Sequence, residues 1–165
     1  ISPVKSEDVA NKLKKKIELV INGGDSKIGL ESTVISLIDK PQILRPGVIG
    51  LKTIDKFLKV KIIKTNSSIR SPGMMKKHYS PGIPVILNQK SAKENCALIT
   101  FGKRYKDRPN FFNLSKNSDL KEAASNLYKT FRKIKNQGYK KIHVVKIPNK
   151  DIGIAINDRL KRASN

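Results

Sequence analysis

A turn-rich stretch near the middle of the chain constrains the fold more than any other feature of the sequence. Residues 66–84 carry two Ser-Pro steps, Ser71-Pro72 and Ser80-Pro81, and are rich in Gly and Ser. Proline lacks a backbone N–H and restricts the residue before it, so a helix or a central strand cannot pass through such a stretch. A structureless segment of this length is usually functional or disordered. The sequence therefore predicts two folded parts, residues 1–65 and 85–165, joined by this linker.

The first part shows short patterns of helix and strand. Ser6 and the two acids after it favour a helix that runs to about Lys16, and residues 51–58 have helical spacing of their apolar side chains. Four short apolar runs predict strands, and the tight turn at 39–42 predicts that two of them form an antiparallel hairpin. The predicted strands are residues 17–21, 33–38, 43–45 and 60–64.

The second part alternates strand and helix patterns. Apolar runs at 85–87, 97–101 and 142–145 predict buried strands. A long amphipathic helix follows Ser118-Asp119 and is closed by Gly138, and a final helix is predicted over 152–163. Strands that alternate with helices predict a small, mainly parallel α/β layer.

The chain of 165 residues is strongly basic. It has 35 Lys and Arg against 13 Asp and Glu, a formal charge of +22. Such a charge attracts polyanions without specificity, so a basic RNA-binding module is one hypothesis. The alternative is that the lysines only form solvated surfaces without a specific ligand. It is favoured because only 7 of the basic residues are Arg, whose planar guanidinium recognises phosphate specifically.

Several classes of protein are excluded by composition. No apolar run approaches the roughly 18 residues that a membrane-spanning helix needs, and the opening residues have no signal-peptide pattern. Cys96 is the single cysteine, so an intramolecular disulfide is impossible and a reducing, cytoplasmic location is predicted. Cys96, His78 and His143 are scattered, so no zinc site is predicted.

Six short segments, taken in order, carry a family resemblance. They are Ser2-Pro3, Gly29-Leu30-Glu31-Ser32-Thr33-Val34, Ile43-Leu44-Arg45-Pro46-Gly47, Ser71-Pro72-Gly73-Met74, His78-Tyr79-Ser80-Pro81, and Gly153-Ile154-Ala155-Ile156-Asn157-Asp158-Arg159-Leu160. Together they resemble the long form of the threonylcarbamoyl-AMP synthase family over essentially the whole chain. The resemblance implies a mixed α/β fold. Residues 1–65 would form the C-terminal portion of a YrdC-like α+β catalytic domain, 66–84 the linker, and 85–165 a small Rossmann-like α/β domain.

The resemblance also implies a reaction. The family is a nucleotidyltransferase that joins L-threonine, bicarbonate and ATP into threonylcarbamoyl-AMP, with release of pyrophosphate, for modification of an adenosine in tRNA. ATP is the substrate, with Mg²⁺ as its companion ion. The Lys-Arg…Asn and Ser-Ala-Asn elements that the family carries ahead of this region do not occur here, and Met75-Lys76-Lys77 replaces its Lys-Tyr-Arg. We therefore expect this polypeptide alone to be inactive, with a missing N-terminal segment or a partner chain completing the site; an inactive remnant is the remaining alternative.

Four residues are candidate substrate contacts by their match to the family motifs. Ser32 matches a threonine contact, and its hydroxyl can both donate to and accept from a zwitterionic amino acid. Arg45, Tyr79 and Ser2 match ATP contacts, and an arginine fork suits the triphosphate. Structural alternatives are an arginine that closes a hairpin, a serine that caps a strand, a disordered chain end, and a tyrosine that anchors the linker. No catalytic nucleophile and no metal ligand are predicted.

Glu31 and His78 lie next to these candidates and have no assigned role. The carboxylate of Glu31 has three open interpretations: a base, a group that orients a cation, or the partner of a lysine. His78 would contact ATP or, equally, anchor the linker between the domains.

Overall fold

The computed structural model describes residues 1–38, 40–58, 78–93 and 95–165. The predicted strand at 60–64 and most of the linker, Met75-Lys76-Lys77 included, lie outside these residues. In chain order the elements are α1 (Ser6–Leu13), the 3₁₀ turn η1 (Lys14–Lys16), β1 (Val34–Ser36), β2 (Gln42–Arg45), α2 (Leu51–Leu58), β3 (Val85–Ile86), β4 (Ala97–Thr100), β5 (Phe111–Asn113), α3 (Leu120–Asn136), β6 (Ile142–Val144) and α4 (Gly153–Ala163).

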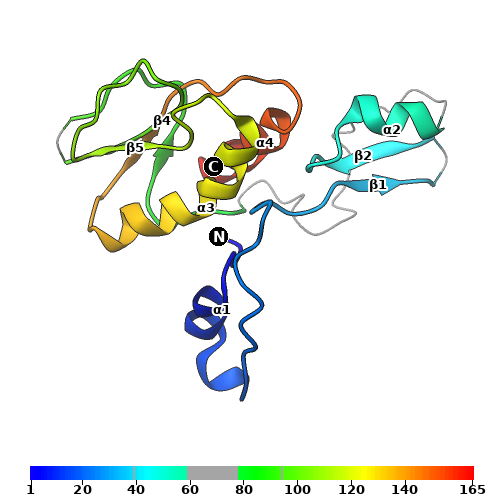
Figure 1. The fold of residues 1–165 in the computed structure, drawn as a ribbon, viewed down its shortest axis with the longest axis horizontal. Helices are drawn as coiled ribbons and strands as arrows, with labels where there is room; N and C mark the ends of the chain where they lie inside the picture. Colours follow the sequence, from blue (N-terminus) through cyan, green and yellow to red (C-terminus); the bar gives the residue numbers. More distant parts are fainter. Residues whose placement is uncertain (39, 59–77, 94) are drawn as a thin grey trace.

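The second part is built on a four-stranded sheet in the order β3-β6-β4-β5, with every neighbouring pair parallel. α3 and α4 lie against this sheet and against each other (Figure 1). The central strand β4 is buried along its whole length, whereas β3, β5 and β6 alternate between buried and more exposed residues. The structure thus confirms the predicted mixed α/β fold with a mainly parallel layer.

The bounds of α3 follow from local signals in the sequence. The Asp119 side chain accepts hydrogen bonds from the backbone N–H groups of Lys121, at 2.7 Å, and Glu122, at 3.4 Å. These bonds satisfy two of the donors that a helix leaves open at its start. Gly138 adopts a φ of +81° just beyond the end of the helix, a conformation that glycine takes without strain. The cap and the stop were both predicted.

The first part forms two projections from the second (Figure 1). One carries α1, and the other carries β1, β2 and α2. β1 pairs with β2 in antiparallel fashion, with Val34 opposite Arg45, so the predicted hairpin is confirmed, as are the helices over Ser6–Leu13 and Leu51–Leu58. Ile54 is the buried apolar side chain of α2.

One predicted strand is absent, and one strand of the structure was not predicted. Residues 17–21 form no strand, because no described strand lies beside them to accept their hydrogen bonds, and Leu19 and Ile21 are 78% and 84% exposed. β5 was missed, since its three residues follow Pro109 and are too few to show a period. Both errors have the same cause: a strand exists only through its partner.

Large exposed apolar side chains gather in the first part. Of the eleven in the described residues, nine lie within 1–58: Leu13, Leu19, Ile21, Ile28, Leu37, Ile38, Ile49, Leu51 and Phe57. The buried apolar cluster, in contrast, is built almost entirely from the sheet, α3 and α4. In the part of the chain that the structure describes, no helix combines the length and the apolar character needed to cross a membrane.

Candidate functional site

The two predicted substrate contacts of the hairpin lie directly beside each other. Ser32 belongs to the loop before β1, and Arg45 is the last residue of β2. The Arg45 guanidinium donates from Nε to the Ser32 carbonyl at 3.0 Å and from Nη2 to Ser32 Oγ at 3.2 Å. A cation and a hydroxyl are thereby held together at the end of the hairpin. An arginine suits a phosphate and a hydroxyl suits an amino acid, so the two groups fit ligands that contact each other.

Gly47 explains why the motif around Arg45 ends in Pro-Gly. A Cβ atom at this position would lie 2.2 Å from the backbone nitrogen of Thr33 and 2.5 Å from the carbonyl carbon of Ser32. Real Cβ atoms do not approach a backbone so closely, so a side chain here would push the two loops apart. Thr33 Oγ1 adds a hydrogen bond of 2.8 Å to the carbonyl of Ile49. The Ser32 loop and the Arg45 loop are therefore packed backbone against backbone.

Tyr79 enters the same region from the chain that follows the linker. Its ring stacks on Tyr128, with centroids 6.0 Å apart and planes at 25°, and meets the edge of His78 at 4.0 Å. Its backbone has a φ of +62°, a left-handed conformation that bulky residues rarely adopt and that collects at functional sites. The side chain is buried, and its Oη makes no hydrogen bond of normal geometry among the described residues, although the Arg45 guanidinium is near enough to lower its pKa. A buried hydroxyl without a well-formed hydrogen bond is costly unless a bound group completes it.

Glu31 joins Ser2 to the C-terminal helices. Its carboxylate accepts hydrogen bonds from Ser2 Oγ, from Tyr128 Oη at 3.1 Å, and from Arg159 Nε at 2.8 Å. Burial acts to raise the pKa of Glu31, but the hydrogen bonds from Ser2 and Arg159 outweigh it and lower the pKa below its ordinary value. Of the three open interpretations, the structure shows ion pairing, although with an arginine rather than the lysine that was considered. Glu31 stays an ionised anchor and is not poised as a base.

Arg159 is the residue that sequence reasoning missed. Its side chain is fully buried, and its Nη1 donates to the Pro46 carbonyl and to Asp158 Oδ2, each at 2.8 Å. Its guanidinium also lies 5.1 Å from the ring centroid of Tyr79. Burial acts to lower the pKa of Arg159, but its bond to Glu31 and the surrounding charges reverse this and raise it.

A sequence signal for Arg159 does exist. It occupies the apolar stripe of the last helix, where the other members at helical spacing are buried: Ile152, Ala155, Ile156, Leu160 and Ala163. A charged residue in such a stripe needs a buried partner, because an unpaired buried charge is strongly unfavourable. The partner, Glu31, is 128 positions away in the sequence. The pattern could therefore show that Arg159 needs a buried partner but not which residue it is.

The aromatic and histidine groups of the site have shifted pKa values. Burial raises the pKa of Tyr79, with the positive charges of Arg159 and Arg45 acting in the opposite direction. Burial likewise raises the pKa of Tyr128, and Glu31 adds to the effect. Burial lowers the pKa of His78, whose Nδ1 has no hydrogen-bond partner among the described residues. All three groups are therefore neutral near neutral pH and present dipoles rather than charges.

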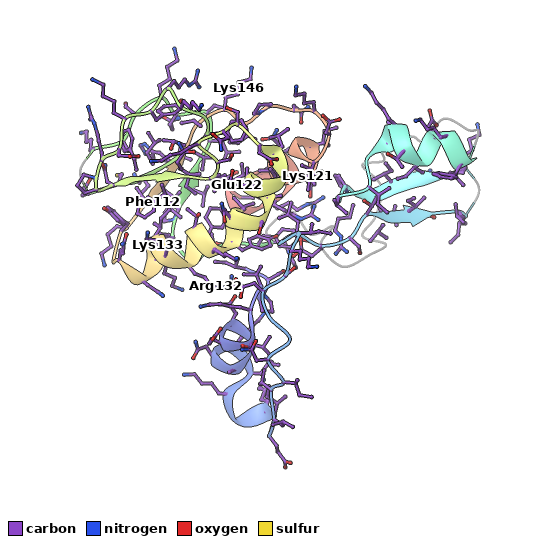
Figure 2. The ribbon with its side chains drawn as sticks, viewed as in Figure 1. Phe112, Lys121, Glu122, Arg132, Lys133 and Lys146 are labelled. Atoms are coloured by element: carbon purple, nitrogen blue, oxygen red, sulfur yellow. The ribbon has the colours of Figure 1, made fainter. Side chains whose placement is uncertain are left out.

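A second polar contact attaches α1 to α3. Arg132 Nε lies 3.1 Å from Asp8 Oδ1, and its Nη2 donates to the Ser2 carbonyl. Asp8 in turn accepts the backbone N–H of Val4 at 2.9 Å. Figure 2 shows Arg132 at the junction where the projecting N-terminal segment meets α3. Ser2 is thus held from both sides, by Glu31 through its hydroxyl and by Arg132 through its carbonyl.

The structure brings all four predicted contacts into one region. Ser2 donates to Glu31, which directly precedes Ser32 in the chain. Arg45 binds Ser32, and Tyr79 lies against Arg159. The described residues contain no cluster of three His, Cys, Asp or Glu side chains that could hold a metal ion. A cleft of about 900 Å³ lies elsewhere, between α1 and α3, and includes neither Arg45 nor Tyr79.

Two family models match the chain. The model described as "Threonylcarbamoyl-AMP synthase, C-terminal domain" matches residues 42–165, and one described as "Telomere recombination" matches residues 1–47. Between them they cover every residue of the sequence. The first alone accounts for well over half of the chain.

Curated relatives are similar over nearly the whole chain. The threonylcarbamoyl-AMP synthase of Pyrococcus abyssi is 31% identical over 99% of this chain and 54% of its own length. That of Schizosaccharomyces pombe is 30% identical over 99% of this chain and 49% of its own. That of Bacillus subtilis is 30% identical over 99% of this chain and 53% of its own. The chain spans about half the length of the curated relatives it matches.

Two solved structures have the same architecture. The crystal structure of P. abyssi Sua5 complexed with L-threonine superimposes with a TM-score of 0.82 at 30% identity, covering 99% of this chain and 54% of that one. A variant of P. abyssi Sua5, in which a histidine and the tyrosine after it are both alanine, gives a TM-score of 0.78 at 28% identity, covering 99% of this chain and 53% of that one. The mixed α/β fold is therefore shared with these structures.

Proposed function

Because the chain belongs to the threonylcarbamoyl-AMP synthase family, we propose that it supplies one wall of a site where ATP and L-threonine meet. In this proposal Arg45 contacts the triphosphate, Ser32 contacts the amino acid, and Tyr79 and Ser2 contact the nucleotide. The reaction is the family's: threonine and bicarbonate combine with ATP at its α-phosphate, and pyrophosphate leaves. It would serve the threonylcarbamoyl modification of adenosine in tRNA, in the cytoplasm.

One observation carries the proposal. Arg45 and Ser32, predicted to contact different substrates, are hydrogen-bonded at 3.2 Å, so ligands that reach both would be held against each other. Positioning of this kind is the main contribution that a protein makes to substitution at phosphorus. The buried Tyr79 Oη, which makes no hydrogen bond of normal geometry among the described residues, supports a polar ligand in the same region. L-threonine is bound in the solved P. abyssi relative, which supports an amino acid as one of the two ligands.

The histidine and tyrosine pair of the linker's end has a counterpart in the solved variant. His78-Tyr79 is the sequence's one His-Tyr pair, and adjacent histidine and tyrosine residues were replaced in that P. abyssi protein. We take the two pairs to be equivalent. Because Tyr79 is neutral and its ring is held by Tyr128 and His78, it would offer ATP a fixed hydroxyl and ring rather than a charge.

The described residues contain no group of three His, Cys, Asp or Glu side chains that would form a Mg²⁺ site. Glu31, the carboxylate nearest the proposed contacts in sequence, is already occupied by Ser2, Tyr128 and Arg159. A divalent ion prefers carboxylate oxygens that are open to it. The proposal therefore assigns no residue to the metal, and no step depends on one.

Calorimetry with ATP and with L-threonine tests the proposal on the purified chain. Replacing Arg45 with alanine removes a charge-assisted phosphate contact, so the Kd for ATP should rise about ten- to hundredfold. Lys40→Ala is the matched control, because Lys40 is an exposed cation of the same hairpin and should leave the affinity unchanged. Equal ATP affinities for the two variants would remove Arg45 from the site.

Turnover is a separate question from binding. Substitution at the α-phosphate needs several preorganised cations and a pocket that excludes water. Among the described residues, Arg45 is the cation proposed for the triphosphate, while Arg159 is fully engaged with protein acceptors. We therefore expect ligand binding without pyrophosphate release by this polypeptide alone, and release when an N-terminal segment of the family is supplied in trans. Threonine-dependent pyrophosphate release by the isolated chain would contradict this expectation.

The division into domains is part of the proposal. We propose residues 1–65 as the C-terminal portion of the catalytic domain, 66–84 as the linker and 85–165 as the Rossmann-like domain. The contrast between the exposed apolar side chains before residue 59 and the buried cluster after residue 78 supports it. Limited proteolysis should cut first within 66–77, and a first cut inside α3 would contradict the boundary.

Non-specific RNA binding is a second candidate, supported by the cleft between α1 and α3. Its lining includes five lysines: Lys5, Lys12, Lys129, Lys133 and Lys135. Two of them already pair with acids, Lys129 with Asp25 at 2.7 Å and Lys5 with Glu7 at 3.7 Å, which lowers the field that they offer a polyanion. Titration of tRNA at increasing salt decides: a steep fall of affinity supports this function, and no binding at low salt rejects it.

A further inference from the structure

The C-terminal helix reaches both loops of the proposed site through one side chain. Arg159 of α4 donates to the Glu31 carboxylate at 2.8 Å, and its Nη2 lies 3.4 Å from the Glu31 carbonyl. It also donates to the Pro46 carbonyl at 2.8 Å. One rigid guanidinium thus binds two segments that are 15 positions apart in the sequence.

The two bonded residues are the immediate neighbours of the proposed contacts. Glu31 precedes Ser32, and Pro46 follows Arg45. Because the Ser32 and Arg45 loops are packed backbone against backbone at Gly47, a constraint on their neighbours sets the separation of the two contacts. Arg159, on the C-terminal helix α4, therefore sets the separation of the Ser32 and Arg45 loops at the end of the hairpin.

The surroundings of Arg159 hold it in one orientation. Asp158 accepts from its Nη1 and is in turn bound by Arg162 Nε at 3.2 Å. The Tyr79 ring lies 5.1 Å from the guanidinium. A buried arginine is tolerated only when its donors are satisfied, and the planar fork does this in a way that the point charge of lysine cannot reproduce.

We propose that Arg159 is a positioning residue, which aligns the ATP loop and the threonine loop and so makes the C-terminal domain a determinant of substrate affinity. Its side chain is fully buried and hydrogen-bonded to protein atoms, so it is not itself a substrate contact. The proposal rests on the proposed function for the identity of the two ligands. It goes beyond that function because it assigns the C-terminal domain a part in the site.

The test separates alignment from simple neutralisation of Glu31. Arg159→Lys keeps the positive charge beside Glu31 but loses the second arm that binds Pro46. Arg159→Met loses both, and Arg108→Lys is the matched control, since Arg108 is an exposed arginine of the same domain over the Phe111 ring. If Arg159 only neutralises Glu31, the lysine variant should bind ATP and threonine like the unchanged chain. If it aligns the loops, both affinities should fall about tenfold in Arg159→Lys and not in Arg108→Lys.

A second readout does not depend on any ligand. In NMR spectra, the amides of residues 31–34 and of Gly47 should broaden by conformational exchange in Arg159→Lys while the sheet amides stay sharp. Unchanged loop amides in a folded Arg159→Lys chain would overturn the proposal. If the unchanged chain binds neither ligand, the proposed function fails, yet the loop amides still decide whether Arg159 aligns the two loops.

A third variant covers the case in which substitution of Arg159 prevents folding. Asp158→Asn is nearly isosteric and leaves Arg159 in place, but it weakens the anchor that orients the guanidinium. The same loop amides should broaden to a smaller extent, and the two affinities should fall together by a few-fold. Sharp loop amides and unchanged affinities in this variant would also overturn the proposal.

Discussion

The two parts of the molecule bury their apolar side chains in opposite ways. Residues 78–165 gather theirs between a parallel sheet and two helices, where Ala97, Leu98 and Ile99 are fully buried. Residues 1–58 have helices of eight residues and a two-stranded sheet, and expose most of their large apolar side chains. An isolated hairpin is marginal in water without a further strand or helix to cover it. The second part therefore has a core that stabilises it, whereas the first part is held in place mainly by its contacts with the second.

Those contacts combine ion pairs with a few apolar side chains. Glu31 with Arg159 and Asp8 with Arg132 connect the parts through ion pairs, and four apolar side chains of the first part join or pack against the shared core: Val4, Ile1, Leu30 and Val48. Polar contacts require exact geometry and are lost together when one partner moves. The orientation of the first part therefore depends on a small number of contacts with the second, and four measurements test this conclusion.

The largest difference between the parts should come from isoleucine to alanine changes. Ile134 of α3 is fully buried, so Ile134→Ala should lower the free energy of unfolding by about 2–5 kcal/mol. Ile38 is 69% exposed, so the same change there should cost within about 0.5 kcal/mol. Urea unfolding of both variants gives the values. Equal losses would show that the first part has a core of its own and would contradict this contrast between the parts.

The next largest effect should come from the contact between α1 and α3. Arg132→Met leaves the buried Asp8 carboxylate without its cation, which should cost about 1–3 kcal/mol of local stability. Hydrogen exchange should then speed up across residues 4–13 and stay unchanged in the sheet. Lys116→Met is the control, because its ion pair with Asp107 is exposed and worth little. Uniform acceleration of exchange over the chain would mean that the two parts unfold as one.

A smaller effect concerns pH. The pKa of Glu31 is lowered from 4.5 in the folded chain, so the unfolded chain binds the proton more tightly. The stabilisation of the folded chain by ionised Glu31 is therefore complete above about pH 4.5, and it is lost as the pH falls through the pKa of Glu31 in the folded chain. The difference in melting temperature between the unchanged chain and Glu31→Gln should shrink as the solution is acidified. A difference that grows toward acid pH would show that Glu31 is not held ionised by Arg159.

The smallest effect on stability should accompany a clear change in dye binding. Leu19 and Ile21 are among the most exposed apolar side chains, so replacing both with serine should leave the free energy of unfolding within about 0.5 kcal/mol of its value. Fluorescence of a dye that binds apolar surface should fall in the variant. Replacing the exposed Lys52 and Lys56 with serine is the control and should not lower it. Undiminished fluorescence would locate the dye-binding surface elsewhere.

The sequence predicted what depends on near neighbours and failed where distant partners decide. The helix after Asp119 and its end at Gly138 follow from local hydrogen bonding and backbone freedom, and both were predicted. The run at residues 17–21 has the composition of a strand, but composition does not supply a partner. For the same reason β5 was invisible, since three residues show no period.

The same distinction between near neighbours and distant partners applies to the residues of the candidate site. Ser32 and Arg45 were selected from short motifs, and antiparallel pairing of the hairpin places them together. The role of Glu31 stayed open because its partner, Arg159, is far along the chain. The pairing of two loops by one guanidinium depends on how the parts dock, which no local pattern encodes.

The bond from Arg159 to the Pro46 carbonyl has a consequence for how this site would vary among related chains. A side chain at one end of a contact constrains the side chain at the other, and the two positions then change together during evolution. A backbone carbonyl is supplied by every residue type, so this end of the contact leaves no trace in residue identity. Correlated substitutions should therefore connect positions 31 and 159 but not 46 and 159, although both bonds measure 2.8 Å. One of these two bonds of Arg159 therefore leaves no signal in covariation and is visible only in the three-dimensional structure.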